Sequence, residues 1–201
     1  MVLSQPDLRA AVERGDIVFD PPLEADQWGE ASIDLRLGFR FTKFVRKGLD
    51  GVSFSIAKGL GALGGLNIWN MKDLKPEDEL GKKEVFKLGP GEFVLALTYE
   101  TVRVPRNLIG VVEGRSTYAR AGLSMHQTAP WIQPGWSGPI VLEIMNNGPL
   151  TIELTPVMDR PCQLSFLRLS SALPQGLEYG SRPGDRYQGQ SIRSSMANDG
   201  R

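Results

Sequence analysis

The chain has 201 residues, of which 41% are hydrophobic and 23% charged, a composition typical of a folded globular protein. Its 23 basic residues balance 23 acidic ones, so no excess of positive charge favours binding to a nucleic acid polymer. No apolar run approaches the ~20 residues needed to span a bilayer and no signal-peptide pattern opens the chain, which predicts a cytoplasmic protein without a membrane partner.

The first expected element is a short helix that begins after Ser4 and ends before Gly15, because these residues suit an N-cap and a C′ position. From Ile17 onward, short strand-like runs are separated by turn residues. Their spacing predicts a mostly β fold, a barrel or sandwich with short peripheral helices, instead of a βαβ fold. The expected strands are 32–37, 39–45, 92–97, 101–104, 108–113, 140–146, 151–154 and 163–169.

Two segments fall outside this strand pattern. Residues 48–83 are rich in glycine and then in charge, and are expected to form an insertion in a single domain that spans 1–174. Their glycines match no phosphate-loop spacing. Residues 175–201 are rich in Gly, Pro, Ser and Arg and lack an apolar period, which predicts a flexible C-terminal tail. Such tails can close over a ligand in an active site.

The sequence holds one cysteine, Cys162, and one histidine, His126. An intrachain disulfide is therefore excluded, and the thiol is expected to act as a small buried hydrophobe. A catalytic zinc site built from three Cys or His ligands is therefore not available, and any hydrolytic enzyme built from this sequence must activate water without such a site. His126 in a β-rich turn is better explained as a hydrogen-bonded structural residue than as a base. Asp34 is similarly expected to satisfy backbone donors or a subunit contact.

The stretch GRSTYARAGL, residues 114–123, follows a predicted strand and combines arginines, hydroxyls and glycines. Arg115, Ser116 and Thr117 offer a guanidinium, hydroxyls and backbone N–H groups, all of them donors that suit phosphate oxygens. A helix start capped by Ser116, with arginines on the surface, explains the same residues without any ligand.

Glu143 interrupts the apolar run of the predicted strand 140–146. Strand alternation places Glu143 on one face with Val141 and Met145. A carboxylate there is either exposed or functional, and a buried one would need a partner such as Arg120. A structural ion pair and a poised base are both consistent with this pattern.

Six blocks resemble, in order, those of the dCTP deaminases, a family that belongs with the trimeric dUTPases. They are SIDLRLG (32–38), PGEFVLA (90–96), GRSTYARAGL (114–123), HQTA (126–129), PGWSGPIVLE (134–143) and RYQGQ (186–190). The resemblance implies a distorted β-barrel that forms a homotrimer with active sites at subunit interfaces. It also implies zinc-independent deamination of dCTP to dUTP, a substrate triphosphate that carries Mg²⁺ with few or no protein ligands, and dTTP as an inhibitor.

The same resemblance assigns roles by position. Glu143 matches the family's essential carboxylate, Ser116 a hydroxyl near the attacked carbon, and Arg120 the arginine that orients the site. Arg115, Ser116 and Thr117 match phosphate contacts, and the backbone of Ala129 matches a contact to the base.

In the tail, Arg186 stands where a basic phosphate ligand is usual, and Tyr187 and Gln190 match residues that close over the nucleotide.

Two positions depart from the family pattern. Trp131 stands where some members carry an arginine and others an aromatic, and is either a packing residue or a stacking wall for the base. Gln133 replaces a usual aspartate and cannot act as a base, which argues against dUTP hydrolysis.

Two other functions are consistent with the sequence. One is a dUTPase-like nucleotide diphosphatase, acting alone or coupled to deamination, with dUMP as its product. The other is a non-catalytic nucleotide-binding homologue. Retention of Glu143, Ser116 and Arg120 together argues against the binding-only protein, because a degenerate binder does not need an acid and its orienting partner.

Overall fold

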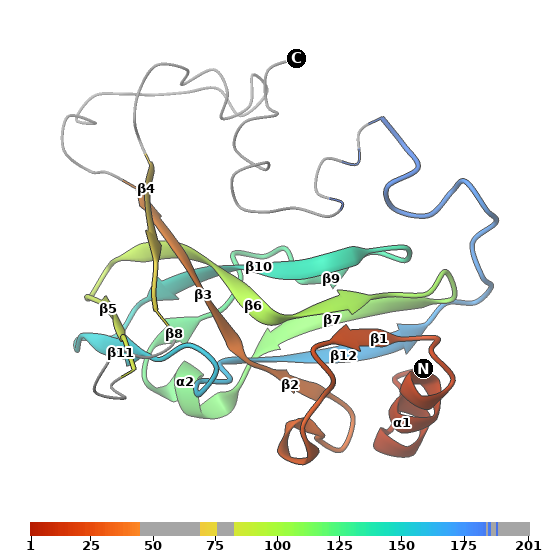
Figure 1. Cartoon of the computed structure of the whole chain (residues 1–201), viewed down its shortest axis with the longest axis horizontal. Coiled ribbons are helices and arrows are strands. Elements are labelled where there is room, and N and C mark those ends of the chain that lie inside the picture. Colours follow the sequence, from red (N-terminus) through yellow and green to blue (C-terminus); the bar gives the residue numbers. More distant parts are fainter. Residues whose placement is uncertain (45–68, 76–82, 184, 186–187, 189–201) are drawn as a thin grey trace.

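The computed structural model of the chain describes residues 1–44, 69–75, 83–183, 185 and 188. Most of the expected insertion at 48–83 and the end of the expected tail lie outside these described residues. Strands dominate the described part, which confirms the mostly β fold (Figure 1). The elements in chain order are α1 (Gln5–Glu13), β1 (Val18–Asp20), η1 (Ala25–Gln27), β2 (Ile33–Leu35), β3 (Leu37–Phe44), β4 (Trp69–Asp73), β5 (Phe86–Leu88), β6 (Phe93–Arg103), β7 (Leu108–Gly114), α2 (Ser116–Arg120), β8 (Leu123–Ser124), β9 (Trp131–Ile132), β10 (Ser137–Asn146), β11 (Ile152–Leu154) and β12 (Cys162–Arg168).

The strands form three antiparallel sheets. A six-stranded sheet has the order β4-β3-β6-β10-β8, with β1 also paired to β6. A four-stranded sheet has the order β2-β12-β7-β9, and β11 pairs with β5 in a third, small sheet. The strands in the described ranges do not close into one ring, so the expected barrel takes the form of separate sheets. Figure 1 shows β6 and β10 running alongside β7 and β12, with α1 at one end.

The core lies between the two larger sheets and follows from strand alternation. Val94 and Ile144 of the six-stranded sheet and Leu164 of the four-stranded sheet are fully buried. Phe19 of β1 and Phe166 of β12 pack edge to face with ring centroids 6.5 Å apart, which joins the two sheets directly.

The expected helix near the N-terminus is confirmed as α1. Ser4 occupies the N-cap position, although its Oγ donates to the carboxylate of Asp7 and makes no capping bond to the backbone. Gly15 has φ +73°, the left-handed conformation that glycine adopts readily after a helix. No helix in the described residues is long and apolar enough to cross a membrane.

A buried ion pair joins β6 to Arg36, the residue between β2 and β3. The side chains of Arg36 and Glu100 are 5% and 0% exposed, and Arg36 Nε lies 2.6 Å from Glu100 Oε1. Glu100 also accepts hydrogen bonds from the Arg36 N–H and from Gln27 Nε2. Arg36 makes a further ion pair with Glu24, which is exposed. Three donors thus satisfy the buried carboxylate.

Candidate functional site

The helix α2 presents most of the predicted phosphate-binding residues. Arg115 is the N-cap of α2, not Ser116, and Ser116 is the first helical residue. The capping role considered for Ser116 is therefore wrong, because β7 ends at Gly114 and the chain turns one residue earlier than that role requires. Ser116, Thr117 and Arg120 are all exposed on this short helix, where they are open to a ligand.

Tyr118 anchors α2 to the loop before β12. Its hydroxyl donates to Asp159 Oδ1 at 2.9 Å and accepts from the Arg160 N–H at 3.1 Å. Burial raises the pKa of Tyr118 to about 12, and the neighbouring Asp159 carboxylate acts in the same direction. The phenol therefore stays neutral and can keep both hydrogen bonds at neutral pH.

Arg115 is held by two groups from other parts of the chain. Its Nε lies 3.1 Å from Asp34 Oδ2 on β2, and its Nη1 donates to the carbonyl oxygen of Arg160 at 3.1 Å. Burial raises the pKa of Asp34, while the charges of Arg115 and Arg160 oppose that shift. Asp34 thus contacts an arginine side chain, a role that the expectation of backbone donors or a subunit contact did not include.

Glu143 lies near the middle of β10 with its carboxylate accessible. The burial pattern of β10 alternates as predicted, with Val141, Glu143 and Met145 on the half-buried face. Glu143 Oε2 accepts a hydrogen bond of 2.8 Å from the Gln127 N–H, and the Gln127 side chain donates to the Glu143 carbonyl. One main-chain donor therefore orients the carboxylate, and its other oxygen Oε1 has no partner among the described residues.

The chain does not bring Arg120 to Glu143. Strand β8 follows α2 and pairs with β10, with Leu123 opposite Asn146. Asn146 lies three residues beyond Glu143, roughly 10 Å along a strand. No hydrogen bond or ion pair joins Glu143 to Ser116 or Arg120 in the described part of the chain. The salt bridge considered for Glu143 and Arg120 is therefore absent within one described subunit.

The segment between Glu143's partner Gln127 and β10 carries the residues expected to face the base and sugar. Ala129, Trp131 and Gln133 are all exposed, and Trp131 keeps 53% of its surface accessible. Trp131 lies on β9, which pairs with β7. An exposed aromatic ring on a fixed strand suits stacking on a planar ligand better than packing in the core.

His126 lies beside this segment, with Nε2 3.3 Å from Glu113 Oε2. This contact agrees with the structural role predicted for His126. Cys162 is fully buried in β12, and burial raises the pKa of its thiol, as expected for a small buried hydrophobe. In the described ranges, no three His, Cys, Asp or Glu side chains come close enough to hold a metal ion.

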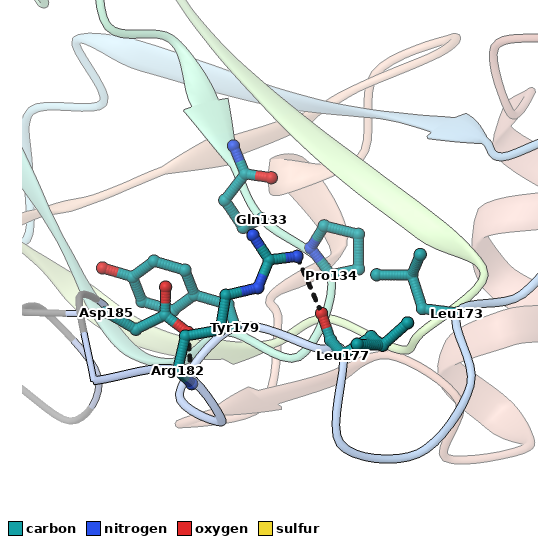
Figure 2. A pocket seen from close by; sticks show the side chains of 7 residues that line it. All are labelled: Gln133, Pro134, Leu173, Leu177, Tyr179, Arg182 and Asp185. Carbon is teal, nitrogen blue, oxygen red and sulfur yellow. Dashed lines mark hydrogen bonds between the residues drawn. The ribbon is translucent and has the colours of Figure 1, made fainter.

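A cavity of about 320 Å³ lies between the turn after β9 and the first part of the expected tail. Figure 2 shows the Arg182 side chain pointing toward Gln133 and Pro134, with Tyr179 and Asp185 nearby. This volume falls in the lower range of small-molecule sites. The lining residues are Gln133, Pro134, Leu173, Leu177, Tyr179, Arg182 and Asp185.

The tail residues that line this cavity are held against the turn. Tyr179 donates its backbone N–H to the carbonyl oxygen of Pro134 at 2.8 Å, and its ring centroid lies 5.7 Å from that of Trp136. The Arg182 N–H donates to Asp185. Sequence reasoning missed Tyr179 and Arg182 because the tail has no apolar period. The signal that was available is an aromatic and a cationic residue close before the RYQGQ block.

Three predicted site residues, Arg186, Tyr187 and Gln190, lie outside the described residues. Asp185 and Gln188 are the described positions next to them, and Gln188 Nε2 donates to the carbonyl oxygen of Gly135 at 2.9 Å. The described tail therefore reaches the turn that carries Gln133.

Comparison with solved structures supports the fold first. The fold is shared with the structure of 2′-deoxycytidine 5′-triphosphate deaminase from Agrobacterium tumefaciens, with a TM-score of 0.61 and 23% sequence identity. The match covers 87% of this chain and 50% of that chain, so this chain spans half the length of that structure.

Sequence comparison then gives the family. The profile of dCTP deaminase-like proteins matches residues 2–169. A dCTP deaminase of Rhodospirillum rubrum is 38% identical over 201 residues, covering 99% of this chain and 98% of its own. A dUMP-forming dCTP deaminase of Halobacterium salinarum is 36% identical, covering 94% of this chain and 91% of its own. The chain belongs to the dCTP deaminase-like family.

Proposed function

We propose that the protein is a zinc-independent dCTP deaminase that converts dCTP and water to dUTP and ammonia in pyrimidine deoxynucleotide metabolism. The observation that carries the proposal is the match, over nearly the whole chain, to proteins named dCTP deaminase. The geometry of Glu143 supports it, because an accessible carboxylate held by one main-chain N–H can exchange protons with a bound ligand.

In this proposal Glu143 moves the protons of the reaction. Water held between Glu143 and Ser116 attacks C4 of the cytosine ring, and Glu143 accepts the proton that the water loses. The same carboxyl gives this proton to the ring nitrogen N3, then takes the proton of the new C4 hydroxyl and passes it to the leaving amino group. The C4–N bond breaks, ammonia departs, and the base becomes uracil. Arg120 orients Glu143 and lies close to the developing charge.

The proposed assembly is a homotrimer whose sites form between subunits. The support is that neither Ser116 nor Arg120 forms a hydrogen bond or ion pair with Glu143 in the described part of one chain. Leu123, which follows α2, pairs with Asn146, three residues beyond Glu143. A neighbouring subunit can bring its own Ser116 and Arg120 to that carboxylate. A site divided in this way is complete only in the assembled protein.

The proposed nucleotide position follows from the accessible polar groups. Arg115, Ser116 and Thr117 contact the phosphates, the backbone of Ala129 meets the base, and Trp131 stacks on it. Magnesium arrives with the triphosphate and belongs to the substrate. A cytoplasmic setting, where free nucleotides are found, fits this role.

In the same proposal, Gln133 faces the sugar and the tail closes the site with Arg186, Tyr187 and Gln190. The support is the contact of the described tail with this turn. Gln188 Nε2 donates to the carbonyl oxygen of Gly135, and a cavity lined by Gln133 and tail residues lies beside it.

Coupled hydrolysis to dUMP is the second candidate function. It is favoured by the relative from Halobacterium salinarum that is named as dUMP-forming. Against it stands Gln133, whose amide cannot remove a proton from a second water. Deamination without phosphate hydrolysis is therefore our preferred function.

The test is to incubate the purified full-length protein with Mg²⁺ and, separately, dCTP, dCMP, CTP and dUTP, and to measure ammonia and pyrophosphate. Ammonia from dCTP that survives a strong zinc chelator is the expected result. Pyrophosphate formed in step with ammonia would indicate the coupled reaction. Nucleotide binding with neither product would contradict the proposal, and addition of dTTP to the dCTP reaction tests inhibition.

A further inference from the structure

The side chain of Arg115 is restrained before any ligand binds. Asp34 contacts its Nε and the Arg160 carbonyl oxygen contacts its Nη1, each at 3.1 Å. These two contacts lie on different sides of the planar guanidinium, because its Nε–H points to the Nη2 side and Nη1 lies on the Cδ side. Of the Arg115 side chain, 36% remains exposed. The held side chain therefore remains open to a ligand.

Asp34 projects from a rigid position. It pairs with Gln163 of β12, and its neighbours Ile33 and Leu35 are buried in the core. Its carbonyl oxygen accepts from Gln27 Nε2 at 2.8 Å, and only 17% of its side chain is exposed. The carboxylate therefore has little freedom to follow a moving arginine.

The other group that contacts Arg115, the carbonyl oxygen of Arg160, is also held in place by its neighbours. The Arg160 N–H donates to Tyr118, and the Arg160 side chain forms an ion pair of 2.7 Å with Asp26. The backbone around the Arg160 carbonyl is thus held on both sides. Two immobile acceptors define one orientation of the Arg115 guanidinium.

We propose that Asp34 is a positioning residue that sets the affinity for the substrate triphosphate by holding Arg115, without touching the nucleotide. This inference rests on the proposed function, in which Arg115 contacts phosphate. A free arginine side chain loses considerable conformational entropy when it binds a ligand. Because Asp34 already orders Arg115, less conformational entropy is lost when the side chain binds phosphate.

The experiment is a double-mutant cycle on the full-length protein. The proteins are the wild type, Asp34→Asn, Arg115→Ala and the double variant, each carrying Glu143→Gln so that dCTP is bound without being deaminated. The measurement is the Kd of the Mg²⁺ complex of dCTP by calorimetry. Asp34→Asn keeps the shape of the side chain and removes its charge. It is expected to raise the Kd of dCTP about tenfold in the wild-type background and not at all in the Arg115→Ala background. Deoxycytidine, which lacks phosphates, is expected to bind the single variant as it binds the wild type in a competition assay.

Asp16→Asn is the matched control, because Asp16 also forms an ion pair with an arginine, Arg14, but on the exposed surface. It is expected to leave the Kd unchanged. If Asp34→Asn does not fold, Asp34→Glu replaces it, since it keeps the charge and displaces Arg115 by the length of one methylene group.

Equal weakening of dCTP binding in both backgrounds, or equal weakening for deoxycytidine, would show a general structural role and overturn the inference. Failure of the proposed function gives a different result. In that case the wild type binds dCTP and releases no ammonia, while the cycle still reports the coupling between Asp34 and Arg115.

Discussion

Replacing Glu100 by glutamine is expected to destabilise the protein strongly, because it leaves a buried guanidinium without its main partner. The Glu100 side chain is 0% exposed and that of Arg36 is 5% exposed. Breaking a buried pair of this kind costs about 3–5 kcal/mol. Glu24 still contacts Arg36, which places the expected loss near the lower limit, about 3 kcal/mol. For a chain of this size that corresponds to a fall in Tm of roughly 6–12 °C.

The assay is urea and thermal unfolding at one fixed protein concentration, because assembly makes apparent stability depend on concentration. Asp16→Asn breaks an exposed pair and is expected to lose less than about 1 kcal/mol. The double variant Arg36→Met with Glu100→Leu is expected to recover most of the loss, since it removes both buried charges. The reasoning is refuted if Glu100→Gln unfolds within about 2 °C of the Asp16→Asn control.

Three further predictions concern the tail, the helix and the thiol. Gly135→Ala is expected to release the tail, because Gly135 has φ +93° and an added Cβ would lie 2.7 Å from Glu178 Cβ. The expected results are faster proteolysis of the tail and a higher KM for dCTP. Unchanged cleavage of the tail would contradict the prediction. Tyr118 has its pKa raised to about 12, so its phenol favours folding below pH ~10 and this stability is lost as pH rises from about 10 to about 12. Tyr118→Phe should remove an ionisation near pH 12 from an ultraviolet titration of the folded protein, and an unchanged titration there would refute the assignment. Cys162 should react with a thiol reagent only as fast as the protein unfolds, because it is fully buried and burial raises its thiol pKa; rapid labelling of the folded protein would exclude this.

The sequence predicted the parts of the fold in which the pattern of apolar residues is local. The alternation in 140–146 placed Glu143 on the accessible face of β10, as the structure confirms. The strands expected at 92–97 and 101–104 are instead one strand, β6. Thr98 and Glu100 interrupt the apolar pattern, yet both are buried, because Thr98 Oγ1 donates to the Glu100 carbonyl and Glu100 binds Arg36. Polar partners far apart in the chain cannot be read from such a pattern.

The candidate site was predictable to a similar extent. The residues on α2 and β10 came from local motifs, and the structure finds them exposed or half-buried, as a site requires. The contact between Asp34 and Arg115 joins residues on β2 and at the start of α2, so neither local motif contains it. The cavity beside Gln133 depends on how the tail packs, which the composition of the tail did not show.

The most direct test of the account is the rate of ammonia release from dCTP by Glu143→Gln, measured beside Glu153→Gln. Glu153 is an exposed glutamate on β11 that pairs with Lys87, so its substitution makes the same chemical change at a surface position. We expect Glu143→Gln to bind dCTP but to lose ammonia release by about 10²–10⁴-fold or more, because the amide cannot accept the proton of water. Glu153→Gln is expected to match the wild type. Ammonia release by Glu143→Gln at the wild-type rate would contradict the central role of this carboxylate.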